Sequence, residues 1–394
     1  VNCGFRAIVD ILKIVNDAFK GILGQIPSRN TIENWIKKCG LDIYNTPEKS
    51  LNAEEYAMIV DESMMMGSEK LLFTLGIPAK HTGDIALSRK DVSILDMSVA
   101  SSWNGDGIQD RLLASSAKIG HSPKYVISDN ASIMEKGINQ TGFVHYHDIS
   151  HSLGMFLERC YKDESDFIAY TKRMSEVQAT HNMKKTAYLL PPRQRTIARF
   201  INLSNWVKWS RKILEVYHQL NHEERALFNF IPDNASLIDE LSEVMECISH
   251  IEKECKQNGF SKNTIKKCLD NIRNTLFKGN SRMKKLGEAI SLFLLKEGKR
   301  LKGEGDILNN SSDIIESSFG TYKRRKSPNK LYGVTPFILF MPACTELAVE
   351  ECSRNYSIKE HLENVKLCQI QQWREVCLTD NLVTKRIKTL KFAV

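Results

Sequence analysis

Residues 55–61, EYAMIVD, form a compact apolar run that ends in an aspartate, and this pattern predicts a buried β-strand. A turn follows, and KLLFTLGI at 70–77 and DVSILDMSV at 91–99 predict two more strands. The short connections between these three runs favour antiparallel pairing. The stretch therefore predicts the antiparallel part of a β-sheet.

Beyond residue 99, predicted helices alternate with predicted strands. A helix over 108–118 precedes the strand KYVISD (124–129), and a short helix over 131–138 precedes the strand FVHYHD (143–148), after which another helix begins. Strands that follow a helical crossover pair in parallel. The order β-β-β-α-β-α-β-α is that of the ribonuclease H fold, whereas ferredoxin-like and doubly wound sheets require a helix between the first two strands.

The rest of the chain has helical patterns. Residues 1–46 predict two helices around a glycine-bearing turn, which fit either a helix-turn-helix DNA-binding segment, incomplete at its start, or a plain helical lead-in. We expect a five-stranded mixed-sheet core with flanking helices in two parts, 47–151 and 311–345. An all-helical insertion over 152–310 separates these parts, and a helical C-terminal region covers 346–394.

Composition restricts the class of protein. The 394 residues include 55 Lys+Arg against 47 Asp+Glu, and 42% are hydrophobic, which is typical of a folded globular chain. The ten cysteines form no C-x-x-C pair, so we expect reduced thiols. Asp10 and Asp17 interrupt the N-terminal apolar pattern, and Pro336 and Pro342 interrupt the longest apolar stretch. We therefore expect no signal peptide, no membrane span and a cytoplasmic location.

Positive charge is concentrated in clusters. Residues 181–212 contain eight Lys/Arg and no acid, and Lys323-Arg324-Arg325-Lys326 form a second cluster. A third, at 385–391, is interpreted as a solvated face. The two larger clusters make a phosphate backbone a plausible partner.

Two aspartates end strands that are neighbours in a ribonuclease H sheet. Asp61 ends the first strand and Asp129 ends the fourth, so we expect both carboxylates at one edge of the sheet. Paired carboxylates bind Mg²⁺ or Mn²⁺, and two such ions support in-line attack on a phosphodiester. Each aspartate alone also fits a simple strand-to-turn cap. As the third carboxylate we predict Glu316, on a helix within SSDIIESSFGTYKRRK, with Asp313 as the rival.

Histidines lie between the second and third carboxylates. His145 and His147 alternate on one strand, but no cysteine stands at ligand spacing, so we do not predict a zinc site. Asp148 and His151 are interpreted as a pair near the carboxylate site that orients its ligands without binding the ion.

These motifs together resemble a DDE-type transposase of a bacterial insertion sequence, with a ribonuclease H-like core. The matching elements are IVDES with Asp61, VISDN with Asp129 and DIIESSFGTYK with Glu316. A D-x-x-H signature, here Asp148 and His151, and the helical insertion before the glutamate are similar too.

The resemblance implies metal-dependent hydrolysis at transposon ends and transfer of the freed 3′-hydroxyl into target DNA. Asp61, Asp129 and Glu316 would hold two Mg²⁺ or Mn²⁺ ions per active site, and two protomers would act on double-stranded DNA. The residues expected to bind the phosphates of the DNA backbone are Arg193, Arg195, Arg199, Lys323, Arg324, Arg325 and Lys326. Trp206 or Trp209 would stack on an unpaired base, or else fill the core of the insertion.

Three other classes compete with this interpretation. A transposase-derived DNA-binding protein would no longer cut, but all three predicted carboxylates are present. Another nuclease of the same fold would not need the long helical insertion. A metal hydrolase that acts on other substrates would leave the basic clusters unexplained.

Overall fold

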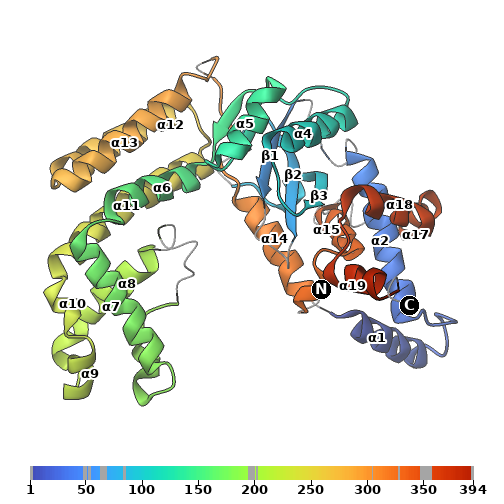
Figure 1. Ribbon diagram of the computed structural model, residues 1–394, viewed down its shortest axis with the longest axis horizontal. Helices are drawn as coiled ribbons and strands as arrows, with labels where there is room; N and C mark the ends of the chain where they lie inside the picture. Colours follow the sequence, from blue (N-terminus) through green and yellow to red (C-terminus); the bar gives the residue numbers. More distant parts are fainter. Residues whose placement is uncertain are drawn as a thin grey trace. The chain divides into compact units, whose positions relative to one another are not determined.

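The chain forms two compact units (Figure 1). The computed structural model describes residues 3–47, 51, 55–62, 69–82, 86–193, 200, 203–303, 305–326, 329–346 and 357–391. Unit 1 comprises the described residues within 1–79, 87–146 and 312–394, and unit 2 those within 80–86 and 147–311. Unit 1 is therefore built from segments on both sides of unit 2 in the sequence.

Unit 1 contains a mixed five-stranded sheet in the order β3-β2-β1-β4-β5. Strands β1, β2 and β3 pair antiparallel, whereas β1 and β4 pair in parallel. The predicted element order from β1 to the helix after β5 is confirmed. The bounds are β1 Tyr56–Glu62, β2 Lys70–Pro78, β3 Ser93–Ala100, α4 Gly105–Ile119, β4 Val126–Ser128, α5 Ser132–Thr141 and β5 His145–His147.

Alternation along β1 assigns its side chains to two faces of the sheet. Met58 and Val60 belong to a core cluster with Ile108 and Leu112 of α4 and with residues of α5. Because successive side chains of a strand point to opposite faces, Ile59 and Asp61 lie on the other face.

Helix α14 (Asp313–Arg325) covers that other face. Phe319 of α14 packs against Phe73 of β2, with ring centroids 5.3 Å apart. Phe73 pairs with Asp61 across β1 and β2. Partners directly opposite in a sheet share a face, so α14 lies over the face on which Asp61 lies.

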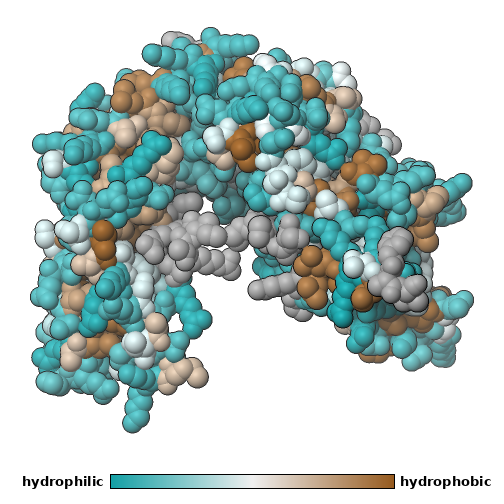
Figure 2. Space-filling model, viewed as in Figure 1, coloured by the Kyte–Doolittle hydropathy of each residue, from teal (hydrophilic) through white to brown (hydrophobic). Residues whose placement is uncertain are grey.

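The N-terminal helices are confirmed as helices, but their connection is long. Helix α1 (Phe5–Ala18) has no buried residue, and its exposed isoleucines contribute to the hydrophobic residues over α1 at the lower right of Figure 2. Residues 19–28 connect it to α2 (Arg29–Asn45), whereas a helix-turn-helix uses three or four residues. The structure gives the helix-turn-helix alternative no support.

Helix α2 packs inside unit 1 through Gly40. A Cβ on Gly40 would lie 1.6 Å from the carbonyl oxygen of Leu339. The glycine therefore permits a close approach between α2 and the turn at 336–339. The remaining elements of unit 1 are η1 Arg89–Asp91, η6 Lys330–Tyr332, η7 Pro336–Leu339, α15 Phe340–Glu346, α17 Ile358–Asn364, α18 Leu367–Cys377 and α19 Leu382–Lys391.

Unit 2 is helical, as expected for most of this segment. The helical stretch that follows β5 is interrupted at 162–164, between α6 and α7. The bounds are α6 Ile149–Tyr161, α7 Ser165–His181, η2 Lys185–Leu189, α8 Leu203–Val216, η4 Tyr217–Gln219, α9 His222–Leu227, α10 Phe230–Asp233, α11 Ala235–Gln257, α12 Lys262–Asn274, η5 Leu276–Lys278 and α13 Ser281–Gly298.

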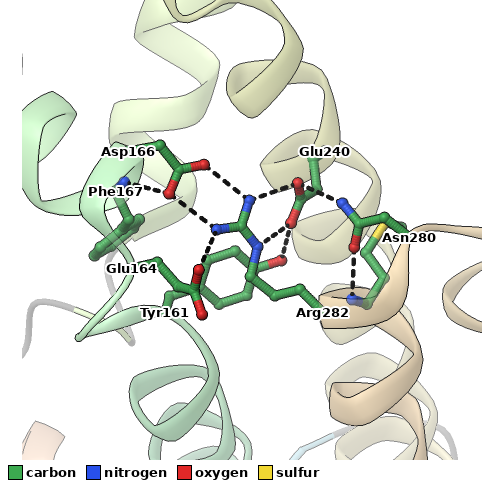
Figure 3. Close-up of polar contacts among 8 residues, drawn as sticks. Tyr161, Glu164, Asp166, Phe167, Glu240, Asn280 and Arg282 are labelled. Atoms are coloured by element: carbon green, nitrogen blue, oxygen red, sulfur yellow. Dashed lines mark hydrogen bonds and ion pairs between the residues drawn. The ribbon is translucent and has the colours of Figure 1, made fainter.

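Arg282 connects four helices of unit 2 (Figure 3). Its guanidinium donates to both carboxylate oxygens of Asp166 at 3.0 Å and to those of Glu240 at 2.9 and 2.8 Å. It also lies 4.9 Å from the ring centroid of Tyr161, whose hydroxyl donates to Glu240 at 2.7 Å. The side chains of Arg282 and Glu240 are 15% and 10% exposed, so this pair is shielded from water, whereas Asp166 is 45% exposed.

Within the part of the chain that the structure describes, no helix is long and apolar enough to cross a membrane. The nine described cysteines are all free, and Cys352 lies outside the described residues.

Two helical glycines give a matched test of the packing of α2. Gly40→Ala is expected to lower the free energy of unfolding by about 2 kcal/mol, because the added methyl group meets a backbone carbonyl. Gly320→Ala, in α14 with open space around the position, is expected to raise it by up to about 1 kcal/mol. Urea unfolding of both variants checks the pair, and equal effects would contradict the packing described.

Arg282→Met is expected to cost about 3 kcal/mol, because Glu240 loses its cation while shielded from water. The hydrogen bonds from Arg282 lower the pKa of Asp166. A lowered carboxyl pKa stabilises the fold only above that pKa, so the free energy of unfolding falls as the solution becomes acidic. This acid-induced decrease should be smaller in the Arg282→Met variant than in the unmodified protein. Urea unfolding at pH 7 and pH 3 measures both effects.

Arg273→Met is the control, because Arg273 forms an exposed pair with Asp270. It should change stability by less than about 0.5 kcal/mol. A similar loss in both variants would mean that the Arg282 network contributes no more than a surface pair.

Candidate active site at the ends of strands β1 and β4

The parallel pairing of β1 and β4 brings two aspartates to the same end of a strand pair. Met58 is aligned with Val126, and Ile59 with Ile127. Asp61 lies two residues beyond Ile59 within β1, and Asp129 directly follows Ser128, the last residue of β4. Because neighbouring strands lie about 4.8 Å apart, both aspartates stand at the same end of adjacent strands.

Local hydrogen bonds orient the backbone around Asp129. Its Oδ1 accepts a hydrogen bond from the N–H of Ala131 at 3.1 Å, so the carboxylate also supports the turn into α5. Ser128, directly before it, is fully buried and lies 2.8 Å from Nε2 of His145 on β5. Asp129 thus follows a strand end whose position is fixed on both sides.

Glu316 lies on α14 one turn before Phe319, the residue that packs on Phe73. Residues three apart on a helix are neighbours, so Glu316 lies beside Phe319 on the helix that covers the face of Asp61. The side chain itself is exposed and flanks the buried stripe of α14, and Asp313 at the start of the helix is exposed as well. Both carboxylates also interact favourably with the N-terminal end of the helix dipole.

A complete ligand set is not formed by the described side chains. Among the residues that the structure describes, no group of three or more His, Cys, Asp or Glu side chains is positioned to hold a metal ion. The structure therefore places Asp61 and Asp129 at the same end of β1 and β4, and Glu316 on α14, while the predicted three-carboxylate site stays a prediction. An aspartate pair alone has the oxygen donors that Mg²⁺ and Mn²⁺ prefer.

Asp148 and His151 belong to unit 2, where they form a helix cap. Asp148 is fully buried, and its Oδ1 accepts from the N–H of His151 at 2.7 Å and contacts Nδ1 of the same residue at 2.9 Å. The D-x-x-H spacing thus has a local structural cause, since an N-cap aspartate binds the third helical N–H. Their predicted support of the carboxylate site stays a prediction.

A buried carboxylate that the sequence pattern did not reveal lies in unit 2. Glu297 is 2% exposed and contacts both the backbone N–H and Nδ1 of His147, while Arg300 donates to both its oxygens at 3.0 and 3.1 Å. In the sequence, only the position of Glu297 next to apolar residues of α13 indicates that its side chain is buried. The His147 side chain is engaged by Glu297 rather than by a metal cluster with His145.

The structure describes some of the expected DNA-binding residues and not others. Arg193 is exposed, whereas Arg195 and Arg199 lie outside the described residues. Lys323, Arg324 and Arg325 occupy the last turn of α14, which favours cations, and Lys326 follows them. Of these, Lys323 lies 5.8 Å from the Phe319 ring centroid and Arg325 lies 5.3 Å from that of Phe340.

The two tryptophans of unit 2 differ in burial. Trp206 is 3% exposed and donates to the carbonyl of Pro192 at 2.7 Å. Trp209 is half-buried, donates to the carbonyl of Leu189 at 3.0 Å and packs edge-on against Phe228. The interpretation as insertion core is confirmed for Trp206, whereas stacking of Trp209 on a base stays a prediction.

No protein-family model matches the chain, and no curated protein matches it at a significant level. The geometry of the sheet and its carboxylates is therefore the basis for inferring a function.

The adjacency of Asp61 and Asp129 has a measurable consequence for stability. Two carboxylates on adjacent strands repel each other, so Asp129→Asn is expected to stabilise the metal-free protein by up to about 1 kcal/mol. Asn keeps the Oδ1 acceptor for Ala131. Millimolar Mg²⁺ or Mn²⁺ should raise the melting temperature of the unmodified protein, and the variant should lose most of this rise.

Glu135→Gln is the matched control, since Glu135 is an exposed carboxylate in the first turn of α5. It should leave the metal-dependent rise unchanged. An equal rise in the Asp129→Asn variant would show that the aspartate pair does not bind the ion.

Proposed function

We propose that the chain is a DDE-type DNA transposase that cleaves phosphodiesters with divalent metal ions and joins the freed 3′-hydroxyl to target DNA. The observation that carries the proposal is the parallel pairing of β1 and β4, which places Asp61 and Asp129 at the same end of adjacent strands, with α14 packed on the face of Asp61. Among the classes considered, this arrangement is best explained by an active site.

The sheet topology supports a ribonuclease H-like assignment. The first three strands pair antiparallel and β1 pairs in parallel with β4, which are the pairings predicted for that fold. In the proposal, the aspartates stand at the carboxyl ends of the two central parallel strands, and Glu316 is supplied by the helix that follows unit 2 in the sequence.

Asp61 and Asp129 would supply oxygen ligands for two Mg²⁺ or Mn²⁺ ions, with Glu316 as the third carboxylate. Bound ions of this kind lower the pKa of a water molecule and stabilise the leaving oxygen of an in-line displacement. The residues' own contribution is to hold adjacent negative charge at a fixed level of the sheet. Without cations this charge would repel a phosphate group.

Basic residues of the chain would neutralise the DNA backbone. Lys323, Arg324 and Arg325 follow Glu316 by about two to two and a half turns of the same helix, so a strand bound there would pass close to the carboxylate. Arg193 and the basic residues around it would add contacts from unit 2. Two transposon ends require two protomers, so a homodimer on DNA belongs to the proposal.

A second candidate is a transposase-derived DNA-binding protein that no longer cuts. One observation favours it, namely that the described side chains do not gather three ligands for a metal ion. Both candidates predict salt-sensitive binding to duplex DNA, but only the first predicts metal-dependent cleavage.

Nicking of supercoiled plasmid DNA in Mg²⁺ or Mn²⁺ distinguishes the two candidates and requires no knowledge of the terminal sequence. The unmodified chain is expected to nick. Asp61→Asn and Asp129→Asn should each lower the rate by about 100-fold or more, since each removes an ionised ligand. Glu316→Gln should do the same, while Asp313→Asn should have little effect.

The nicking and binding results distinguish the assigned residues and the two candidate functions. Nicking that survives both aspartate substitutions would refute the assigned site. Loss in Asp313→Asn but not in Glu316→Gln would transfer the third role to Asp313. DNA binding without any nicking would favour the second candidate, and no binding to duplex DNA at low salt would refute both.

A further inference from the structure

Unit 1 contains a pocket of about 400 Å³ that lies apart from the carboxylate pair. It is formed by α2, β3, α4 and α18, and its walls include Tyr44, Asp96, Arg111, Lys118 and Trp373. A cavity of this volume is in the range that binds small organic ligands. The proposed nuclease chemistry uses none of these residues.

The pocket contains more positive than negative charge. Asp96 is 4% exposed and accepts a hydrogen bond from the Tyr44 hydroxyl through Oδ1 at 3.2 Å. Its other oxygen, Oδ2, is buried without a hydrogen bond and lies 3.6 Å from Nε of Arg111. Lys118 adds a second cation, so two cations face one carboxylate.

Neither cation is fully neutralised by its neighbours. The guanidinium of Arg111 makes only the 3.6 Å pair with Asp96 and a 3.9 Å contact with the sulfur of Cys377 among the described residues. Lys118 donates to the carbonyl of Leu95 at 2.8 Å and lies over the Tyr44 ring. Burial lowers the pKa of Lys118 to about 8 and raises that of Asp96. Both shifts are typical of charges that lack sufficient partners.

The remaining wall is aromatic. Tyr44 and Trp373 pack edge to face with ring centroids 5.9 Å apart, and Trp373 is 8% exposed. Val376 and the stems of Gln369 and Gln372 continue this wall along α18. A planar ring fits against such a surface, whereas a bare inorganic ion would leave it uncovered.

We propose that this pocket binds a small aromatic anion, a planar ring that carries one phosphate or carboxylate group. The anionic group lies between Arg111 and Lys118, and the ring lies against Trp373. A purely structural ion-pair network would join the same elements, but it would not require a cavity lined by two incompletely paired cations. The inference does not depend on the proposed DNA chemistry.

Pyridoxal 5′-phosphate is a suitable probe, because it combines a planar ring, a phosphate and an aldehyde. The Lys118 amine attacks the aldehyde carbon, a C–N bond forms and water leaves, which gives an imine. Borohydride then delivers hydride to the imine carbon, the nitrogen takes a proton from water, and the product is a stable secondary amine. Peptide mass spectrometry measures the labelled fraction of each lysine.

In the unmodified protein at pH 7.5, Lys118 is expected to label saturably at a concentration about tenfold below that needed for Lys124, an exposed lysine paired with Glu55. Pyridoxal, which lacks the phosphate, should label Lys118 about tenfold less well, the effect of losing one charge-assisted hydrogen bond. Phenyl phosphate should protect Lys118 at lower concentrations than inorganic phosphate does.

Arg111→Gln and Trp373→Leu should each weaken labelling of Lys118 about tenfold without changing that of Lys124. The comparison of the two aldehydes uses unmodified protein, so it stands even if a variant folds poorly. Equal labelling of Lys118 and Lys124, or equal labelling by the two aldehydes, would overturn the proposal. Protection by inorganic phosphate as strong as that by phenyl phosphate would refute the aromatic part of it.

Discussion

The parallel pairing of β1 with β4 is the constraint on which the rest of unit 1 depends. Two aligned residue pairs, Met58 with Val126 and Ile59 with Ile127, set the level at which both strands end. Met58, Val60 and Val126 are buried in one core cluster with α4 and α5, which fixes the face that each strand presents. A slip of one residue would move these apolar side chains to the opposite face. Their burial therefore stabilises this register over the alternatives. The common end of β1 and β4, at which Asp61 and Asp129 stand, is a consequence of this core.

The opposite face depends on a distant part of the chain. Phe73 is fully buried, and Phe319 of α14 contributes to its cover from a position far downstream in the sequence. Closing a long loop costs entropy that grows only slowly with its length, so an intervening unit is compatible with this contact. Helix α14 begins with two acids and ends with basic residues, an order that agrees with the helix dipole and also places the basic cluster beyond Glu316.

Much of this fold could be predicted from local patterns, because apolar runs such as 55–61 and 70–77 lie in a central sheet that is buried on both sides. That β1 and β4 are neighbours, with Asp61 and Asp129 at the same end, could also be predicted from the order of elements. The break between α6 and α7, the Arg282 network and the pocket beside Asp96 could not be predicted, since each depends on side chains that are distant in the sequence. Asp148 and His151 show a further limit, because one spacing fits both a helix cap and a functional pair. The helix that carries Glu316 could be predicted, but the exposure of its side chain could not be foreseen.

The order of segments in unit 1 has a consequence for synthesis on the ribosome. All five strands, together with α4 and α5, are complete once residue 147 has emerged, so the aspartate pair can form early. Helix α14 emerges only after the whole of unit 2. Until then the nascent chain carries an apolar sheet face around Phe73 without the Phe319 ring that packs on it. The third predicted carboxylate, Glu316, joins the sheet last, so the timing of translation itself keeps an unfinished chain from having all three.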